Sequence, residues 1–313
     1  MNFVKPPRLR SGDLVGLIAP ASAPDSPDKI QRSIAYFEKL GYRVKLGSNI
    51  EARSGYLAGK DQERAADLNA MLNDRDVKAI FAIRGGYGTP RILPFVDYRA
   101  ARRYPKIIVG FSDITALQLA LLRRSGLVTI SGPMPGVELW NKPDPYTEEH
   151  FWRIVTSARP IGRLRNPPHE PRAGHNFAVA EGLLLGGNLA LVCSLLGTKY
   201  VPSFSQALLF LEEVDEYPHR VDRMLVQLRN ADVFKHVSGV LLGKFSHCDP
   251  KDASKPHLSI REVLDDLAEW CPRPIIENLQ YGHIPKKLSL PIGVRARMNS
   301  KTGTVDVPEA AVV

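Results

Sequence analysis

The sequence predicts an α/β protein with a parallel, doubly wound sheet in its first half and a second, mixed α+β domain. Short β-branched runs alternate with helical patterns in the first half, which is typical of a parallel sheet. Residues 158–178 are rich in Pro, Arg and polar residues and predict a linker. Strand-like runs are frequent after it. We therefore expect domains over 1–157 and 179–313.

The first-half elements follow from apolar patterning and helix stop signals. Residues 28–40 place Ile30, Ile34 and Phe37 on one helical face, and Gly41 ends the pattern. The other elements are predicted in the same way. The strands are 14–19, 42–46, 79–83, 107–109 and 128–131, and the helices are 28–40, 62–73 and the segment after Ser112.

The second half mixes strands and helices without a regular alternation. Two glycine-started runs near the C-terminus, 293–299 and 303–307, predict a hairpin. The remaining predicted strands are 181–185, 208–212, 237–244 and 274–276, and the helices are 189–196, 219–230 and 259–271.

Composition excludes several classes of protein. The 313 residues are 44% hydrophobic and 24% charged, which is ordinary for one large globular domain or two. The net charge of +9 is spread over short clusters, without zinc-finger spacing or an aromatic RNA-binding signature. We therefore expect neither a nucleic-acid partner nor a disordered chain.

The N-terminus and the cysteines predict a cytoplasmic protein. No signal-peptide pattern precedes the first strand, and no run approaches the roughly 18 apolar residues of a membrane helix. Three widely spaced cysteines, Cys193, Cys248 and Cys271, argue against a disulfide framework or a cysteine-rich metal site.

Three loops leave the carboxyl ends of predicted parallel strands, where ligands of such sheets bind. They are 20–24, 84–88 and 110–113. We expect all three to converge on one crevice.

The third loop carries a candidate nucleophile. The run 107–109 ends at Gly110, Ser112 follows, and a helical pattern begins at Ile114. A serine on a sharp strand-to-helix turn exposes its Oγ, as a nucleophile requires. However, Ile114 stands where the familiar G-x-S-x-G elbow has glycine, and serine is also a common helix N-cap. Both interpretations stay open on this segment alone.

The loop Arg84-Gly-Gly-Tyr-Gly88 exposes backbone N–H groups. It lacks the lysine of a P-loop and the spacing of a dinucleotide fingerprint. An oxyanion hole, a phosphate cradle and a plain tight turn are the alternatives.

An acid and a base are available in the second half. Glu212 ends an apolar strand, where a carboxylate can orient a histidine. Glu213, Asp215 and Glu216 are expected to face solvent or pair with nearby arginines, and a metal site among these acids has little support. His283 lies in a Gly/Pro-flanked loop, where catalytic residues concentrate. The order Ser112, Glu212, His283 is the nucleophile–acid–base order of α/β-hydrolases.

Several segments together resemble the serine-type L,D-carboxypeptidase (muramoyltetrapeptide carboxypeptidase) family, which includes the microcin C self-immunity peptidases. The resemblance covers nearly the whole chain. It runs through 15–22, 55–59, 83–88, 110–113, 186–189, 211–212, 220–225 and 281–285.

The resemblance implies roles for these residues. Ser112 is the implied nucleophile, Glu212 the acid and His283 the base, and the backbone N–H groups of Gly86 and Asp113 are the implied oxyanion donors. It further implies a Rossmann-like N-terminal domain, a smaller β-rich C-terminal domain, and a homodimer without metal or cofactor.

The implied reaction is acyl transfer at the L,D-peptide bond to the terminal D-alanine of murein tetrapeptides, during cytoplasmic peptidoglycan recycling. Arg84 and Tyr87 are candidate substrate-binding residues. A microcin-type peptidase that cleaves peptidyl-nucleotides is the alternative within the same chemistry. A nucleotide-binding oxidoreductase lacks its glycine fingerprint here, and a catalytically inactive peptide-binding module is opposed by the presence of Ser112, Glu212 and His283.

Overall fold

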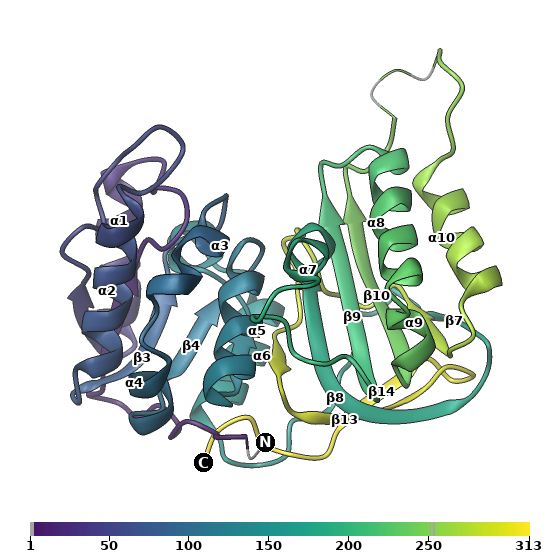
Figure 1. Ribbon diagram of the computed structural model, residues 1–313. Helices are drawn as coiled ribbons and strands as arrows, with labels where there is room; N and C mark the ends of the chain where they lie inside the picture. Colours follow the sequence, from purple (N-terminus) through teal and green to yellow (C-terminus); the bar gives the residue numbers. More distant parts are fainter. Residues whose placement is uncertain (1–2, 251, 253) are drawn as a thin grey trace.

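A computed structural model describes residues 3–250, 252 and 254–313. Figure 1 shows two lobes, each built around one sheet, with α5 (Ile114–Ser125), α6 (Pro145–Thr156) and α7 (Leu189–Leu195) lying in the region between the sheets. The expected division into an N-terminal α/β part and a C-terminal part richer in strands is confirmed.

The first sheet has the strand order β12-β5-β4-β3-β1-β2. Its pairs from β2 to β5 are parallel, as the alternation of strands and helices predicts. The central strands consist almost wholly of buried residues, which is typical of a sheet covered on both faces. The sequence-predicted strands correspond to β1 (Leu14–Ile18), β2 (Arg43–Leu46), β3 (Val77–Ala82), β4 (Ile107–Gly110) and β5 (Thr129–Ser131).

The helices of this lobe begin and end at recognisable signals. Asp97 and Asp144 cap α4 (Tyr98–Arg103) and α6 by accepting backbone hydrogen bonds, and Gly126 ends α5 in the left-handed region. The remaining elements are α1 (Pro27–Lys39), α2 (Asp61–Asn73), α3 (Thr89–Ile92), the 3₁₀-helix η1 (Leu93–Phe95) and the π-helix η2 (Pro135–Leu139).

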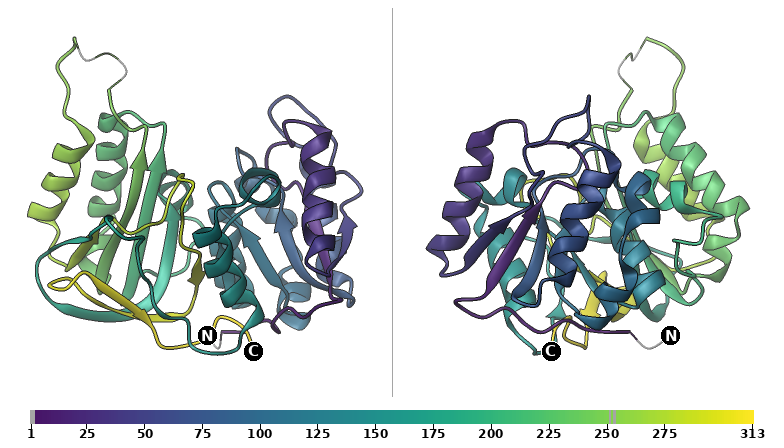
Figure 2. Two further views of the ribbon diagram at one scale, coloured as in Figure 1. Left: turned by 180° about the vertical axis from the view of Figure 1, so that it is seen from behind. Right: turned by 60° about the vertical axis from the view of Figure 1, so that its left-hand side comes forward.

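The sixth strand of the first sheet comes from the far end of the chain. β12 (Leu290–Ile292) pairs antiparallel with β5. The left view in Figure 2 shows this C-terminal segment passing between the two lobes. The segment that carries His283 is therefore followed at once by a strand anchored in the lobe that carries Ser112.

The second sheet has the order β6-β14-β13-β8-β9-β10-β11-β7. Its centre, from β8 to β11, is parallel, and its other pairs are antiparallel. The predicted C-terminal hairpin is confirmed as β13 (Arg295–Asn299) and β14 (Thr304–Val307). The parallel strands are β8 (Val179–Asn188), β9 (Ala207–Val214), β10 (Gly239–Ser246) and β11 (Ile275–Glu277).

Residues 158–178 contain more structure than a linker. They form β6 (Gly162–Arg163) and β7 (Ala173–His175), which are the two edge strands of the second sheet. Helices α8 (Pro218–Asn230) and α10 (Ile260–Trp270) pack side by side over one face of this sheet, with α9 (Val233–His236) after α8.

The two ends of the chain lie together. Arg8 N–H donates to the Val313 carbonyl oxygen, and Val313 N–H donates to that of Pro6. Within the described residues, no helix is long and apolar enough to cross a membrane.

Candidate functional site

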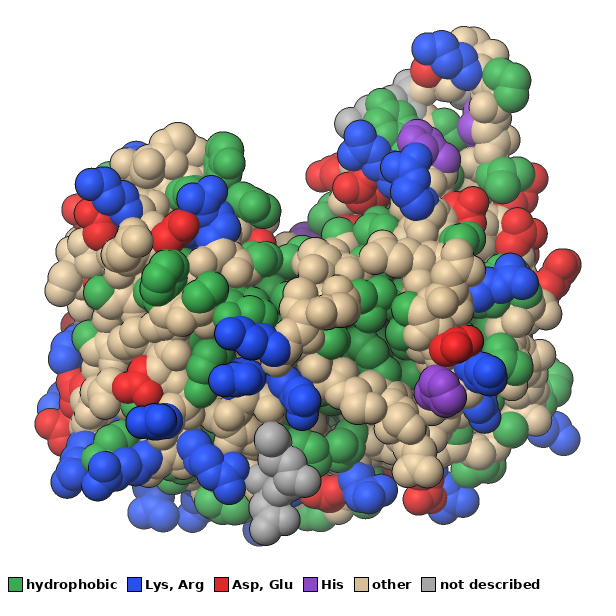
Figure 3. Space-filling view, in the orientation of Figure 1, with side chains coloured by type: hydrophobic (Ala, Val, Ile, Leu, Met, Phe, Trp, Pro, Cys, Tyr) green, Lys and Arg blue, Asp and Glu red, His purple; other side chains and the backbone are tan. Residues whose placement is uncertain are grey.

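The three predicted loops meet at the carboxyl ends of the first sheet. Ser22 N–H donates to the Gly85 carbonyl oxygen at 3.3 Å, and Gly88 N–H donates to Asp113 Oδ1 at 3.2 Å. Figure 3 shows the surface hollowed between the two lobes, on the side where α3 and α7 follow their strands in Figure 1. The expected convergence on one crevice is confirmed.

Ser112 occupies the turn between β4 and α5 in a strained conformation. Its φ is 63°, in the left-handed region that non-glycine residues seldom adopt. A Cβ on Gly110 would lie 2.5 Å from Ile114 Cγ2. The sharp turn therefore needs glycine at position 110, and this lets Ile114 stand where the familiar elbow has glycine.

Glu212 and His283 form a hydrogen-bonded pair. His283 Nδ1 lies 2.8 Å from Glu212 Oε2, the Glu212 side chain is fully buried, and that of His283 is 25% exposed. An ionised carboxylate can only accept hydrogen bonds, so this contact puts a proton on Nδ1. His283 Nε2 is then left as the basic nitrogen, which is the arrangement of an acid–base pair in a serine hydrolase.

Phe111 connects the nucleophile turn to the base. Its ring packs against the His283 ring with centroids 4.7 Å apart and lies edge-on to Tyr281 at 5.4 Å. No hydrogen bond joins Ser112 to His283 in the described part of the chain. Such contacts often tighten only when substrate is bound.

Glu213 has a different environment from Glu212. The expectation that it faces solvent or an arginine is wrong, because its side chain is buried. Its oxygens accept from Asn188 Nδ2 at 2.7 Å and from Ala190 N–H at 2.9 Å, at the start of α7. Burial raises the pKa of Glu213. Of the two adjacent glutamates, only Glu212 contacts His283, and only Glu213 accepts from the backbone of α7.

Asn188 is a site residue that sequence reasoning did not single out. Its Oδ1 accepts from Leu191 N–H and caps α7, while its Nδ2 donates to Glu213 and, at 3.3 Å, to Glu212. The sequence signal that could have identified it is an asparagine between a predicted strand and a predicted helix, because asparagine is a preferred N-cap.

The two implied oxyanion donors have free N–H groups. Gly86 N–H and Asp113 N–H donate no hydrogen bond to any other described residue. The N–H group that follows each of them is occupied: Tyr87 N–H donates to Ser22 Oγ at 3.2 Å, and Ile114 N–H donates to the Phe111 carbonyl oxygen. A Cβ on Gly86 would lie 2.3 Å from Ser22 Oγ, so glycine is required there.

The two candidate substrate-binding side chains, Arg84 and Tyr87, differ in whether they already have a partner in the protein. The Arg84 guanidinium pairs with Asp25 and contacts the Ala23 carbonyl oxygen, which compensates part of its charge. Tyr87 is 47% exposed, and its ring meets Tyr56 edge-on at 5.6 Å between centroids. Tyr87 is therefore open to a ligand, whereas Arg84 already has an acidic partner.

The described residues contain no cluster of three or more His, Cys, Asp or Glu side chains suited to a metal ion. All three cysteines are free and buried. Burial raises the pKa of the Cys193 thiol to about 12 and that of Cys248 to about 11, which disfavours the reactive thiolate.

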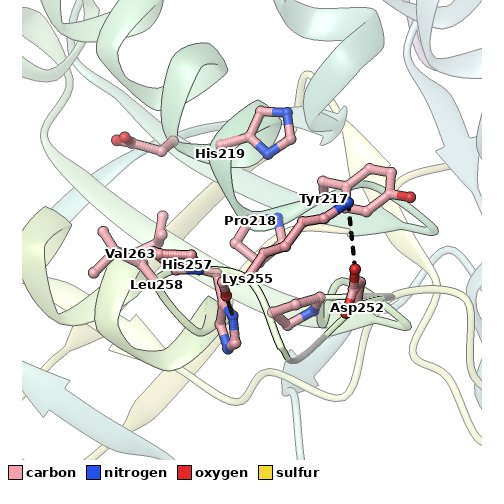
Figure 4. Close-up of a pocket in the computed structure, with 11 residues that line it drawn as sticks. Tyr217, Pro218, His219, Asp252, Lys255, His257, Leu258 and Val263 are labelled. Carbon is pink, nitrogen blue, oxygen red and sulfur yellow. Dashed lines mark hydrogen bonds and ion pairs between the residues drawn. The ribbon is translucent and has the colours of Figure 1, made fainter.

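A separate cavity of about 300 Å³ lies in the second lobe (Figure 4). Tyr217, Pro218 and His219 line it from the start of α8, and Lys255 and His257 line it from the loop after β10. Lys255 pairs with Asp252 at 3.3 Å. None of the predicted site residues lines this cavity.

Comparison with known proteins gives matches over both lobes. Residues 15–132 match the family model of the LD-carboxypeptidase N-terminal domain, and residues 181–298 match that of the LD-carboxypeptidase C-terminal domain. A Bacillus subtilis (strain 168) relative, named probable murein peptide carboxypeptidase, is 39% identical over 314 residues, covering 100% of this chain and 96% of the relative.

Solved structures agree with these matches. Muramoyltetrapeptide carboxypeptidase from Oxalobacter formigenes matches with a TM-score of 0.81 and 31% identity, covering 94% of this chain and 97% of that one. An active-site mutant of the microcin C7 self immunity protein MccF, in the apo state, matches with a TM-score of 0.90 and 24% identity, covering 99% and 100%. The second likeness concerns the fold.

Proposed function

Because this chain belongs to the LD-carboxypeptidase family, we propose that it is a serine carboxypeptidase that removes the terminal D-alanine from murein tetrapeptides. The observation that carries the proposal is the pairing of a buried glutamate with His283 in the crevice that also holds the strained Ser112 turn. The matches to proteins named murein peptide carboxypeptidase and muramoyltetrapeptide carboxypeptidase support the substrate class.

In the proposed reaction, Ser112 Oγ attacks the carbonyl carbon of the L,D-peptide bond while His283 Nε2 takes its proton. The C–N bond then breaks, and His283 returns the proton to the leaving D-alanine amine. A water molecule, deprotonated by His283, then attacks the acyl carbon. The ester bond to Ser112 Oγ breaks, His283 returns the proton to that oxygen, and the shortened peptide leaves. Throughout, Glu212 fixes the imidazole tautomer and stabilises its protonated form.

The proposed oxyanion donors are the N–H groups of Gly86 and Asp113. Both belong to loops at the carboxyl ends of the sheet, and Asp113 precedes the first residue of α5, where the helix dipole favours negative charge. Preorganised donors of this kind contribute about 2.7–4 kcal/mol each to transition-state stabilisation.

Arg84 and Tyr87 are proposed to contact the substrate beside the scissile bond. For Arg84 this requires the substrate carboxylate to share the guanidinium with Asp25 or to replace Asp25.

We further propose a homodimer that acts in the cytoplasm on peptides released during peptidoglycan recycling.

A microcin-type self-immunity peptidase is the second candidate. An Escherichia coli relative named microcin C7 self-immunity protein MccF, 25% identical over 334 residues, favours it. This candidate uses the same proposed serine chemistry on a peptidyl-nucleotide. A non-catalytic peptide-binding module is the third candidate, and it predicts binding without turnover.

One competition experiment separates these candidates. Purified protein is given disaccharide tetrapeptide and an aspartyl-nucleotide amide in separate and mixed reactions, and the products are identified by mass spectrometry. The proposal predicts faster loss of one alanine from the tetrapeptide. Preferential cleavage of the nucleotide amide supports the second candidate, and cleavage of neither supports the third.

A further inference from the structure

Both the side chain and the backbone carbonyl of Asp113 accept hydrogen bonds from residues 88 and 89. The carboxyl group is 1% exposed and accepts hydrogen bonds from Gly88 N–H at 3.2 Å and Thr89 N–H at 2.8 Å. The Thr89 hydroxyl in turn donates to the Asp113 carbonyl oxygen. The residue after Ser112 is thus bonded directly to the end of the glycine loop, residues 85–88.

Arg64 holds the same loop from α2. Its side chain is fully buried, and Nη1 donates to the Gly88 carbonyl oxygen at 2.9 Å and to that of Pro20 at 2.5 Å. A Cβ on Gly88 would lie 2.6 Å from this nitrogen, so the close contact requires glycine. Gly88 therefore donates its N–H to a buried carboxyl group, and its carbonyl oxygen accepts from a buried guanidinium.

These contacts hold the loop on both sides of Gly86 and leave the Gly86 N–H group without a partner among the described residues. Gly85 accepts from Ser22, Tyr87 donates to Ser22, and Gly88 is held from both sides. Gly86 N–H, like Gly85 N–H, donates no hydrogen bond to another described residue. Burying polar and charged groups is costly unless they are well paired, so a buried carboxyl group and a buried guanidinium at one glycine loop indicate a need for fixed geometry.

We propose that Asp113 and Arg64 are positioning residues that hold the glycine loop, and with it Gly86 N–H, at a fixed place relative to Ser112. This inference rests on the proposed function, because it treats Gly86 N–H as an oxyanion donor. It predicts that loosening the loop impairs stabilisation of the transition state more than binding of the substrate.

The test compares Asp113→Asn with Asp67→Asn. Asp67 is a matched control, because it is also a buried carboxylate of the first lobe that accepts a backbone N–H, that of Asn49, outside the glycine loop. Asp113→Asn turns an amide toward the Gly88 and Thr89 donors. We expect kcat for disaccharide tetrapeptide to fall about tenfold to a hundredfold with little change in KM, while Asp67→Asn leaves both unchanged.

A second readout does not depend on the natural substrate. A fluorophosphonate labels an activated serine, and its phosphoryl oxygen uses the same donors as the oxyanion. We expect Asp113→Asn to slow labelling of Ser112 and Asp67→Asn not to. Thr89→Val, which removes one hydroxyl contact at nearly constant volume, gives a smaller effect of the same kind if Asp113→Asn does not fold.

The outcomes separate the two claims. Wild-type protein that is labelled but releases no D-alanine contradicts the proposed function, and the labelling rates of the variants still test the positioning role. An Asp113→Asn protein that folds and matches Asp67→Asn in kcat and labelling overturns the inference. So does a rise in KM at constant kcat.

Discussion

At the residue scale, two adjacent glutamates show how environment separates roles. Glu212 and Glu213 are both buried, but successive side chains of a strand point to opposite faces. Both accept from Asn188 Nδ2, but Glu212 contacts the imidazole of His283, whereas Glu213 accepts from the Ala190 N–H in the first turn of α7. The first contact is suited to catalysis and the second to holding a helix.

We therefore expect different results from two matched substitutions. Glu212→Gln removes the charge that stabilises the imidazolium, and kcat should fall by at least about a hundredfold with the fold retained. Glu213→Gln faces an amide toward the Ala190 N–H donor and should cost about 1–3 kcal/mol in the free energy of unfolding, with kcat nearly unchanged. Steady-state kinetics and urea unfolding check both. Equal losses of kcat would contradict the assignment of Glu212 as the acid.

Much of the candidate site was predictable at this scale. Ser112 and His283 stand out locally, one on a strand–turn–helix pattern and the other in a Gly/Pro-flanked loop. The contact between Glu212 and His283 depends on tertiary packing across 71 positions. The order of the residues and the resemblance both suggested it, but local patterning could not bring the two side chains together. The burial of Glu213 and the role of Asn188 have no periodic signal, and therefore could not be predicted from patterning.

At the element scale, the predicted strands are those with continuous or alternating apolar residues. β12 has three residues with a central proline and is defined by its pairing with β5, far away in the sequence. β6 and β7 are short edge strands inside a Pro- and Arg-rich segment. Short strands carry too little local information to be distinguished from loops, so the sequence predicted neither their existence nor their sheet. The boundaries at 157 and 178 stay predictions.

One contact between elements should make stability depend on pH. His150 of α6 accepts a hydrogen bond at Nδ1 from Ser289 N–H, next to β12. Burial, with a smaller contribution from the charge of Arg153, lowers the pKa of His150 to about 3. The unfolded chain binds this proton near pH 6.5, and the folded chain does not. The contribution of neutral His150 to the free energy of unfolding is therefore fully present above pH 6.5, and it is lost progressively as the pH falls toward 3.

His150→Asn provides the comparison, because its amide oxygen can accept the same hydrogen bond and does not titrate in this range. Below pH 6.5, the wild-type free energy of unfolding should fall faster than that of the variant, by up to about 1.4 kcal/mol per pH unit. Urea unfolding between pH 7.5 and 4.5 measures the difference. If the free energies of unfolding of the wild type and the variant changed with pH in parallel, His150 would be protonated as easily in the folded chain as in the unfolded chain.

At the scale of the whole molecule, the site is assembled from both lobes. Ser112 follows β4 of the first sheet and Glu212 lies in β9 of the second, and the loop carrying His283 is bound to the first lobe. Thr147 Oγ1 donates to the Pro285 carbonyl oxygen, and Lys287 Nζ pairs with Glu138 at 2.6 Å. The Lys287 side chain is 2% exposed and also lies over the Phe111 ring.

We expect Lys287→Met to weaken the fold and the site together. Removing one partner of a buried ion pair leaves the other charge uncompensated and costs about 3–5 kcal/mol. Because Phe111 contacts both Lys287 and His283, kcat should also fall. In a double-mutant cycle, adding Glu138→Gln should recover part of the lost stability. Additive losses would contradict a coupled pair.

The central claim is that Ser112 is the nucleophile of a carboxypeptidase acting on murein tetrapeptides. The most direct measurement incubates wild-type protein and Ser112→Ala with disaccharide tetrapeptide and follows the loss of one alanine by mass spectrometry. We predict that the wild type releases D-alanine and that the folded variant does not. Comparable release by a clean, folded Ser112→Ala preparation would contradict the account.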